Sequence, residues 1–153
     1  MTWTLQGLWV SLCSMCALTA IASETGVIIN TVFYFGIGLF IFGFCIEIIA
    51  DKQKSEFRAI PENRDKFINS GLWAKSRHPN FFGEIILWTG IAIMSLSSLN
   101  GLQYLTLISP IFTYLLLVYV SGVRMLEARA DVKWGNNDAY IQYKSETPVL
   151  MIN

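Results

Sequence analysis

Three long stretches of this sequence contain no charged residue: 5–22, 27–46 and 85–123. A helix needs about 20 mainly apolar residues to cross the ~30 Å hydrocarbon core of a bilayer. The first two stretches are each long enough for one crossing, and the third is long enough for two. Charged residues make up only 14% of the chain, against about a quarter in typical soluble domains. The pattern therefore predicts an integral membrane protein.

The third stretch divides at Ser97-Ser98-Leu99-Asn100-Gly101, where Asn-Gly after serine is typical of a turn. We therefore predict an all-α membrane fold with about four transmembrane helices, over residues 5–22, 27–48, 81–98 and 103–123. The loops at 23–26 and 99–102 are short, so both are expected on the same side of the bilayer. The whole chain, 1–153, is interpreted as a single membrane domain.

The positive charges are strongly segregated. All 11 Lys and Arg residues follow either the second or the fourth predicted span, and the two short loops have none. Basic residues favour the cytoplasmic side of membrane proteins. We therefore expect a multi-pass protein whose loop 49–80 and C-terminal tail 124–153 are cytoplasmic. The first six residues contain no basic residue, which argues against a cleaved signal peptide.

The two polar pieces are predicted to be partly helical. The second span should continue as a helix beyond residue 48 and end before Pro61, and Pro79 suits the first turn of the third helix. The fourth span should continue as a helix to about Lys133, and a short amphipathic segment should cover residues 139–144, with Tyr140 and Tyr143 on one face. Cys13 and Cys16 share a helix face inside a span, and the chain has one His, so no metal site is expected.

A candidate anion site lies just before the third span. Lys75, Arg77, His78 and Asn80 offer hydrogen-bond donors beside a helix N-terminus, an arrangement that suits phosphate, pyrophosphate or carboxylate. If the helix extended back to Arg77, then Arg77, Asn80 and Glu84 would lie near one face. Alternatively, Arg77 and Glu84 only anchor the helix end. The chain has no GxGxxG or P-loop motif, so a nucleotide would bind in some other way.

The run from Ser70 to Glu84, SGLWAKSRHPNFFGE, resembles the signature of the DUF1295 family. That family is related to the C-terminal domains of steroid 5-alpha-reductases and more distantly to sterol reductases and isoprenylcysteine carboxyl methyltransferases. The resemblance extends over nearly the whole chain, including residues 50–57, 61–67 and 121–127. Members are typically longer, and residues 3–10 look like an internal family segment. We therefore expect this chain to lack the family's N-terminal helices.

The resemblance implies a membrane-embedded, NADPH-dependent reductase of a C=C bond in a steroid-like or other lipid substrate. The cofactor would lie among cytoplasmic loops and helix ends, and no nucleic-acid partner is expected. Carried over by motif, the cofactor-binding residues are Asn63, Lys66, Arg77, His78, Asn80, Glu84, Glu127, Tyr140 and Tyr143. In the related steroid reductases the groups that engage the substrate come largely from the part missing here, so no catalytic residue is named.

Two other functions remain open. Isoprenylcysteine-type methyltransferases, which use S-adenosylmethionine, share an Arg-His-Pro motif at a helix start. They tend to carry a Glu-Glu pair after the last span, where this chain has Glu127-Ala128, and this departure favours the reductase. The chain could also be a non-catalytic membrane fragment that assembles with partners. Binding of NADPH, of S-adenosylmethionine or of neither separates the three hypotheses.

Overall fold

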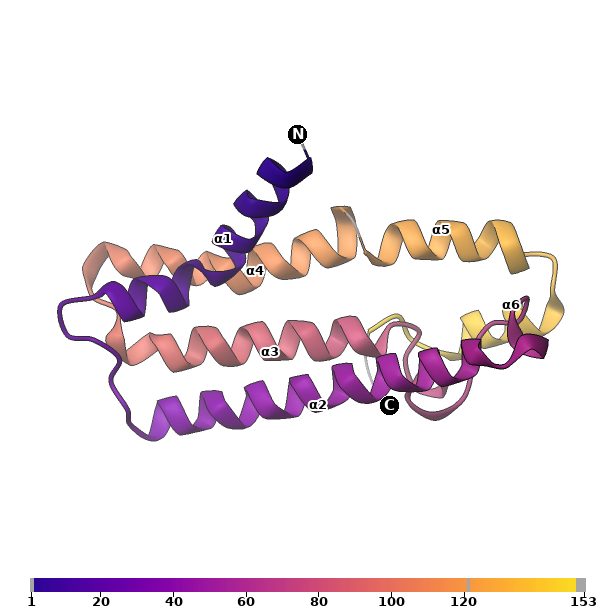
Figure 1. Cartoon of the computed structure of the whole chain (residues 1–153), viewed down its shortest axis with the longest axis horizontal. Coiled ribbons are helices and arrows are strands. Elements are labelled where there is room, and N and C mark those ends of the chain that lie inside the picture. The colour runs from indigo at the N-terminus through magenta and orange to yellow at the C-terminus, as the bar shows by residue number, and fades with distance from the viewer. Residues whose placement is uncertain (1, 121, 151–153) are drawn as a thin grey trace. The chain divides into compact units, whose positions relative to one another are not determined.

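The computed structural model of the chain describes residues 2–120 and 122–150, and side chains from residue 6 onward. Figure 1 shows its α-helices, and the intervening segments contain short 3₁₀ and π-helical turns. The α-helices are α1 (Thr2–Ala22), α2 (Thr31–Ala59), α3 (Pro79–Ser95), α4 (Ile108–Leu115), α5 (Val123–Trp134) and α6 (Asp138–Glu146). The 3₁₀ turns are Pro61–Asn63, Gly71–Ala74, Leu96–Ser98 and Gly101–Leu107, and the π-helical turn is Leu116–Val120.

The predicted membrane fold is confirmed. Within the described residues, three helical stretches are long and apolar enough to cross a membrane: Thr31–Ala59, Pro79–Ser98 and Gly101–Trp134. A shorter apolar helix covers Gln6–Ala22. Large apolar side chains such as Phe35 and Ile41 are more than half exposed, at 63% and 53%. In a membrane protein such side chains face lipid, which is as apolar as they are.

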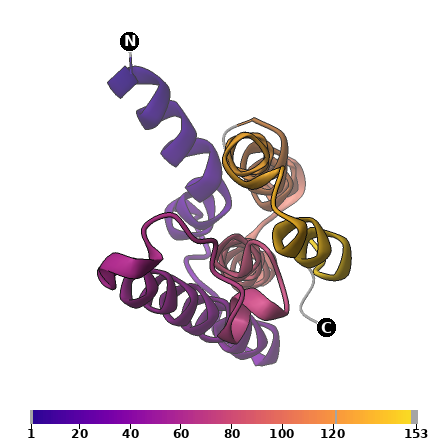
Figure 2. The same cartoon turned by 90° about the vertical axis from the view of Figure 1, so that its right-hand side faces the viewer.

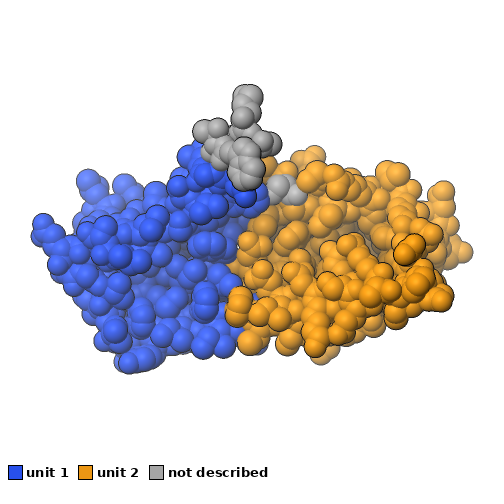
Figure 3. Space-filling model, viewed as in Figure 1, with its two compact units in different colours: residues 1–43, 85–116 blue, residues 44–84, 117–153 orange. Residues whose placement is uncertain are grey.

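The chain forms two compact units, coloured separately in Figure 3. Unit 1 comprises residues 1–43 and 85–116, and unit 2 comprises residues 44–84 and 117–153. All 11 Lys and Arg residues belong to unit 2, whereas Glu24 is the single charged residue in the sequence of unit 1. The two units therefore differ completely in the interactions available to them.

Unit 1 brings α2 and α3 together through two glycines. A Cβ atom on Gly36 would lie 2.6 Å from Cγ of Met94 and 2.8 Å from the carbonyl oxygen of Gly90. A Cβ atom on Gly90 would lie 2.6 Å from the backbone nitrogen of Phe40. Small residues let membrane helices approach closely, since apolar burial adds little between helices in lipid.

The two short loops of unit 1 are bonded to each other, which confirms that they lie at the same end. The backbone N–H of Ile28 donates to Oγ of Ser98 (2.8 Å), and Nδ2 of Asn30 donates to Oγ of Ser97 (2.9 Å). The first loop is longer than predicted, because α2 begins at Thr31 instead of residue 27. Asn30 sets this start, since its Oδ1 accepts the N–H of Phe33 (3.1 Å).

The fourth predicted span, 103–123, is less regular than expected. It begins as a 3₁₀ helix, Gly101–Leu107, becomes α-helical at Ile108 and passes into the π-helical turn Leu116–Val120. Pro110 lies in the first turn of the α-helical part and has no N–H to give the carbonyl of Thr106 an α-helical bond. Farther along, Thr113 donates to the Ser109 carbonyl (3.0 Å), and Oγ of Ser109 donates to Sγ of Cys16 in α1 (3.0 Å).

Unit 2 matches the predicted polar helices. The helix α2 continues to Ala59, and Pro61 opens the following 3₁₀ turn. The helix α3 starts at Pro79, and α5 runs to Trp134. Asn137 caps α6, because its Oδ1 accepts the N–H of Ala139 (2.9 Å). In Figure 2 the right-hand side of Figure 1 faces the viewer. The loop between α2 and α3 is visible there together with α5 and α6 (orange to yellow).

Candidate functional site

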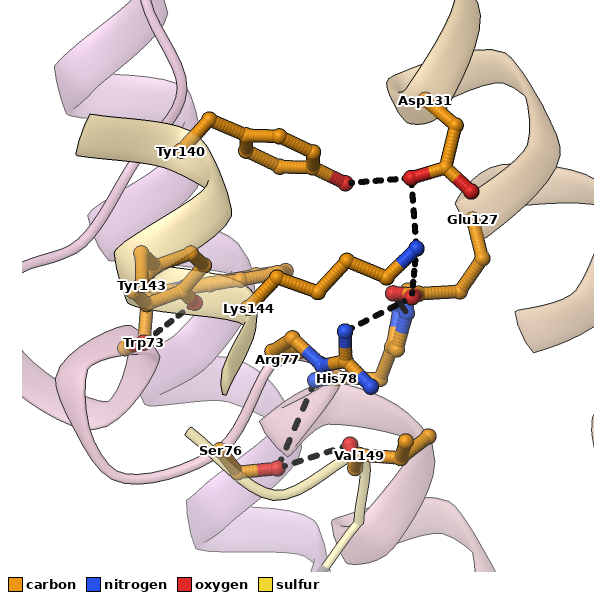
Figure 4. A network of polar contacts seen from close by, with 10 residues as sticks. All are labelled: Trp73, Ser76, Arg77, His78, Glu127, Asp131, Tyr140, Tyr143, Lys144 and Val149. Atoms are coloured by element: carbon orange, nitrogen blue, oxygen red, sulfur yellow. Dashed lines mark hydrogen bonds and ion pairs between the residues drawn. The ribbon is translucent and has the colours of Figure 1, made fainter. Parts of the chain in front are cut away.

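Two adjacent residues before α3 converge on one carboxylate of α5 (Figure 4). Nη1 of Arg77 lies 2.9 Å from Oε2 of Glu127, and Nε2 of His78 lies 2.8 Å from Oε1 of the same residue. The three side chains are 11%, 8% and 18% exposed. The imidazole of His78 also stacks on Phe81, with ring centroids 5.7 Å apart. Glu127 therefore joins the loop before α3 to α5.

The surroundings of Glu127 keep it ionised. Burial by itself would raise its pKa, but the hydrogen bond from His78 and the charges of Arg77 and Lys144 outweigh burial and lower the pKa. Lys144 of α6 lies 3.8 Å from Glu127 and donates to Asp131 (2.5 Å), one turn further along α5. The pKa of Asp131 is lowered chiefly by this bond. Lys144 thereby attaches α6 to α5.

Two tyrosines of α6 hold their hydroxyl protons tightly. The hydroxyl of Tyr143 donates to the Trp73 carbonyl (2.6 Å), and that of Tyr140 approaches Asp131 (3.4 Å). Burial is the first cause that raises the pKa of each tyrosine to about 12, and the nearby Glu127 carboxylate adds to it. Both phenols are therefore neutral donors at physiological pH.

Arg77, His78, Glu127, Tyr140 and Tyr143 border a pocket of about 460 Å³ that lies entirely within unit 2. The volume falls in the range of about 300–1,000 Å³ typical of small-molecule sites. Six cationic side chains line it: Lys54, Arg58, Arg64, Lys66, Arg77 and Lys133. Glu127 is the one acidic residue among the lining residues, and it is already engaged by Arg77 and His78. Cationic side chains therefore outnumber carboxylates in the lining, although Lys133 is also paired with Asp65 (3.1 Å).

Aromatic rings form the other part of the lining. Phe67 packs against Tyr140 and Tyr143, with centroids 5.3 and 5.4 Å apart, and against Trp134 at 6.1 Å. Two indoles are fixed by backbone acceptors: Nε1 of Trp134 donates to the Asp65 carbonyl (2.7 Å), and Nε1 of Trp73 donates to the Ala50 carbonyl (3.0 Å). Such rigid rings offer flat surfaces on which a planar ligand group can stack.

Arg77 retains unused donor capacity at this pocket. Its Nη1 makes a close ion pair with Glu127 without the alignment of a hydrogen bond, and among the described residues neither Nη1 nor Nε has a hydrogen-bond partner. Both atoms are buried. Buried donors in folded proteins are nearly always paired. An anionic ligand group that accepts from Arg77 would satisfy this requirement.

The pocket lining includes seven of the nine residues expected to bind a cofactor: Asn63, Lys66, Arg77, His78, Glu127, Tyr140 and Tyr143. Asn80 and Glu84 of α3 are outside the lining. Oδ1 of Asn80 is buried without a hydrogen-bond partner among the described residues. The condition for a shared face of Arg77, Asn80 and Glu84 is not met, because α3 starts at Pro79 and leaves Arg77 outside the helix.

The sequence interpretation missed several lining residues, among them Lys54, Arg58, Lys133, Trp73 and Trp134. The helical spacing of some of these residues could have indicated that they share a helix face. Lys54, Phe57 and Arg58 recur at helical spacing on the extension of α2, and Glu127, Ala130, Lys133 and Trp134 do so on α5. These mixed basic and aromatic faces resemble ordinary solvated helix surfaces in the sequence, so only the shared pocket distinguishes them.

The fold and the pocket define a helical membrane protein with a basic, aromatic-lined pocket in its charged unit 2. A family model described as "Protein of unknown function (DUF1295)" matches residues 1–147. The chain therefore belongs to the DUF1295 family, as the motif from Ser70 to Glu84 predicted. No curated protein and no solved structure matches the chain.

Proposed function

We propose that this protein is an NADPH-dependent reductase of a C=C bond in a lipid-like substrate, with the pocket of unit 2 as its nucleotide site. The observation that supports the proposal is the combination of six cationic side chains and several aromatic rings around one pocket of about 460 Å³. The cations suit phosphate groups, and the rings suit a planar base.

Charge favours NADPH over S-adenosylmethionine. NADPH carries a pyrophosphate and a further phosphate, so it is strongly anionic. S-adenosylmethionine carries a sulfonium and an amino acid group and has no phosphate. The lining offers six cationic side chains against one carboxylate, and that carboxylate is already paired with Arg77 and His78. An excess of cations stabilises the first ligand and opposes the second.

The residues of the pocket would bind and orient the nucleotide. Arg77 would donate to a phosphate through its buried, unpaired Nε, and Glu127 would hold the guanidinium and the His78 ring in place. When bound, NADPH supplies the hydride for the reduction, and the protein provides position and electrostatics. The apolar spans would give a lipid-like substrate access from the bilayer.

We also propose that the pocket faces the cytoplasm, as the positions of the basic residues favour. A cysteine introduced at Asn63, in a chain whose three native cysteines are replaced, should react with an impermeant reagent only from the cytoplasmic side. Reaction from the opposite side would contradict this orientation.

Calorimetric titration of the detergent-purified protein with NADPH, and separately with S-adenosylmethionine, tests the proposal. Saturable binding of NADPH alone is the expected result. Binding of S-adenosylmethionine alone would replace the proposal with a methyltransferase. Binding of neither would leave a non-catalytic membrane protein as the better description.

The Arg77→Gln variant tests which residue binds the nucleotide. Loss of a charge-assisted hydrogen bond should weaken NADPH binding by about 1.5–3 kcal/mol, which is roughly 10- to 150-fold in Kd. Arg129→Gln is the matched control, because Arg129 is an exposed arginine of α5 outside the pocket lining. Equal NADPH affinity in the Arg77 variant and its control would remove Arg77 from the site.

A further inference from the structure

The backbone that carries Arg77 and His78 depends on the C-terminal segment for support. Residues 76–78 lie between the 3₁₀ turn Gly71–Ala74 and α3, outside any helix. The N–H of Arg77 donates to the carbonyl of Pro148 (2.9 Å), and the N–H of His78 donates to the carbonyl of Val149 (3.0 Å). Oγ of Ser76 donates to the same Val149 carbonyl (3.1 Å), as Figure 4 shows.

These contacts are partly shielded from solvent. Ser76 is 0% and His78 is 7% exposed, whereas Pro148 and Val149 are of intermediate exposure. Hydrogen bonds in such surroundings are stronger than at the surface, and leaving their donors unpaired is costly. The C-terminal segment therefore fixes the backbone of residues 76–78 in one conformation.

That conformation is needed to bring Arg77 and His78 to the same point. Consecutive side chains of an extended chain point to opposite sides. Here both side chains reach the carboxylate of Glu127, one at each oxygen, at 2.9 and 2.8 Å. The chain must therefore bend at these residues. The N–H groups at the bend are the ones bonded to Pro148 and Val149.

We propose that Pro148 and Val149 are positioning residues, a C-terminal strap whose two carbonyls hold Arg77 and His78 at the pocket. They follow the part of the chain that the family model matches, residues 1–147. The strap continues directly from α6, which supplies Tyr140 and Tyr143 to the pocket lining. One continuous segment thus provides both a wall of the pocket and the support of its buried cation. The nucleotide as ligand rests on the proposed function, whereas the positioning does not.

Two shortened chains test the strap. The first ends at Thr147 and lacks the strap, and the second ends at Leu150 and retains it. The sequence contains one histidine, so isotope-labelled histidine in detergent micelles reports on His78 alone by NMR, provided that the purification tag contains no histidine. The chain ending at Thr147 should show a displaced His78 signal. Its Kd for NADPH should rise about tenfold, the equivalent of ~1.4 kcal/mol. The chain ending at Leu150 should match the full chain in both measurements.

An unchanged His78 signal and an unchanged NADPH affinity in the chain ending at Thr147 would overturn the proposal. If the strap acts through Arg77, then removing the strap and replacing Arg77 should have non-additive effects on the Kd for NADPH. Arg77→Gln should therefore weaken NADPH binding less in the chain ending at Thr147 than in the full chain. Complete additivity would reduce the strap to a general stabiliser and contradict its positioning role.

The strap can still be tested if the full chain does not bind NADPH or if the shortened chain does not fold. If the full chain does not bind NADPH, the proposed function fails, but the His78 signals of the two shortened chains still test the strap. If the chain ending at Thr147 does not fold, Ser76→Ala decides, because this variant removes the side-chain bond to Val149 (3.1 Å) together with the longer bond that Oγ of Ser76 accepts from the N–H of His78 (3.4 Å). A shifted His78 signal is expected in Ser76→Ala, and an unchanged signal would overturn the proposal.

Discussion

The two units of this protein are built from the same kind of helix but are stabilised by different interactions. In unit 1 the contacts are close glycine packing and single hydroxyl bonds, such as Gly36 against Gly90 and Ser109 to Cys16. In unit 2 the contacts are ion pairs, aromatic clusters and bonds between loops, centred on Glu127. The division follows the sequence, since Glu24 is the only charged residue of unit 1.

The difference follows from the side chains that each unit contains. In lipid, helices gain little from apolar burial and associate through close packing and a few polar contacts. Unit 2 holds several charges around a pocket, and it tolerates them because each carboxylate oxygen of the partly exposed Glu127 has a cationic or imidazole partner. Changes to charge should therefore affect unit 2, and changes to side-chain size should affect unit 1.

The largest expected effect comes from Glu127→Gln in unit 2. It leaves the buried Arg77 without its counter-charge and should lower the free energy of unfolding by about 2–3 kcal/mol, less than for a fully buried pair because Glu127 is partly exposed. Denaturant titration in detergent measures this loss. Glu56→Gln is the control, because its ion pair with Lys52 is exposed (67% and 73%) and should contribute little. Similar losses in both variants would contradict a special role for the Glu127 cluster.

The stability gap between the wild type and Glu127→Gln should depend on pH. The folded-state pKa of Glu127 is lowered from the ordinary value of 4.5, so its ionised form contributes stability that is fully present above that value. The gap should stay constant from neutral pH down to about pH 5 and close progressively as the pH falls below 4.5. Denaturant titrations of both chains between pH 7 and pH 3 measure it. A gap that is independent of pH would show that charge is not the cause.

Gly36→Ala should disrupt unit 1 without altering any charge. The new Cβ would lie 2.6 Å from the side chain of Met94 and 2.7 Å from its backbone nitrogen, and overpacking of this kind costs about 1–3 kcal/mol. Gly38→Ala, two residues further on, is the matched control, since nothing lies within 4 Å of its Cβ position. Thermal unfolding of both variants in detergent checks the expected difference. A midpoint for Gly38→Ala as low as that for Gly36→Ala would contradict the close packing at Gly36.

The smallest effect is expected from Ser98→Ala in unit 1. Ser98 is 0% exposed and accepts the N–H of Ile28 (2.8 Å), so its loss should cost about 1 kcal/mol. Hydrogen exchange at Ile28 should increase, because its amide loses that acceptor. Ser11→Ala removes an exposed serine hydroxyl of α1 and should change neither stability nor exchange at Ile28. Unchanged exchange in Ser98→Ala would show that another acceptor can replace this hydroxyl.

Much of the fold could be predicted because membrane helices follow local rules. The uncharged stretches gave the spans, Pro61 and Pro79 gave helix ends, and the break after Trp134 separated α5 from α6. The observed bounds differ from the predicted ones at the ends of two spans. Asn30 caps α2 and sets its start at Thr31, and the fourth span begins as the 3₁₀ helix Gly101–Leu107.

The candidate site could be predicted only in part. The motif resemblance selected seven of the residues that line the pocket. It did not select Lys54, Arg58 or Lys133, whose spacing is that of any amphipathic helix. Helical spacing also suggested a shared face for Arg77 and Glu84, although Arg77 lies outside α3 and pairs with Glu127.

The sequence by itself determined that this is a helical membrane protein whose positive charges are segregated, because the cost of placing charge in hydrocarbon acts on each residue locally. The tertiary structure alone decided which charges meet. His78 and Glu127 are 49 residues apart in the chain, and the strap at Pro148 and Val149 is more distant still. Such contacts depend on the packing of several segments at once, and no local pattern in the sequence specifies their partners.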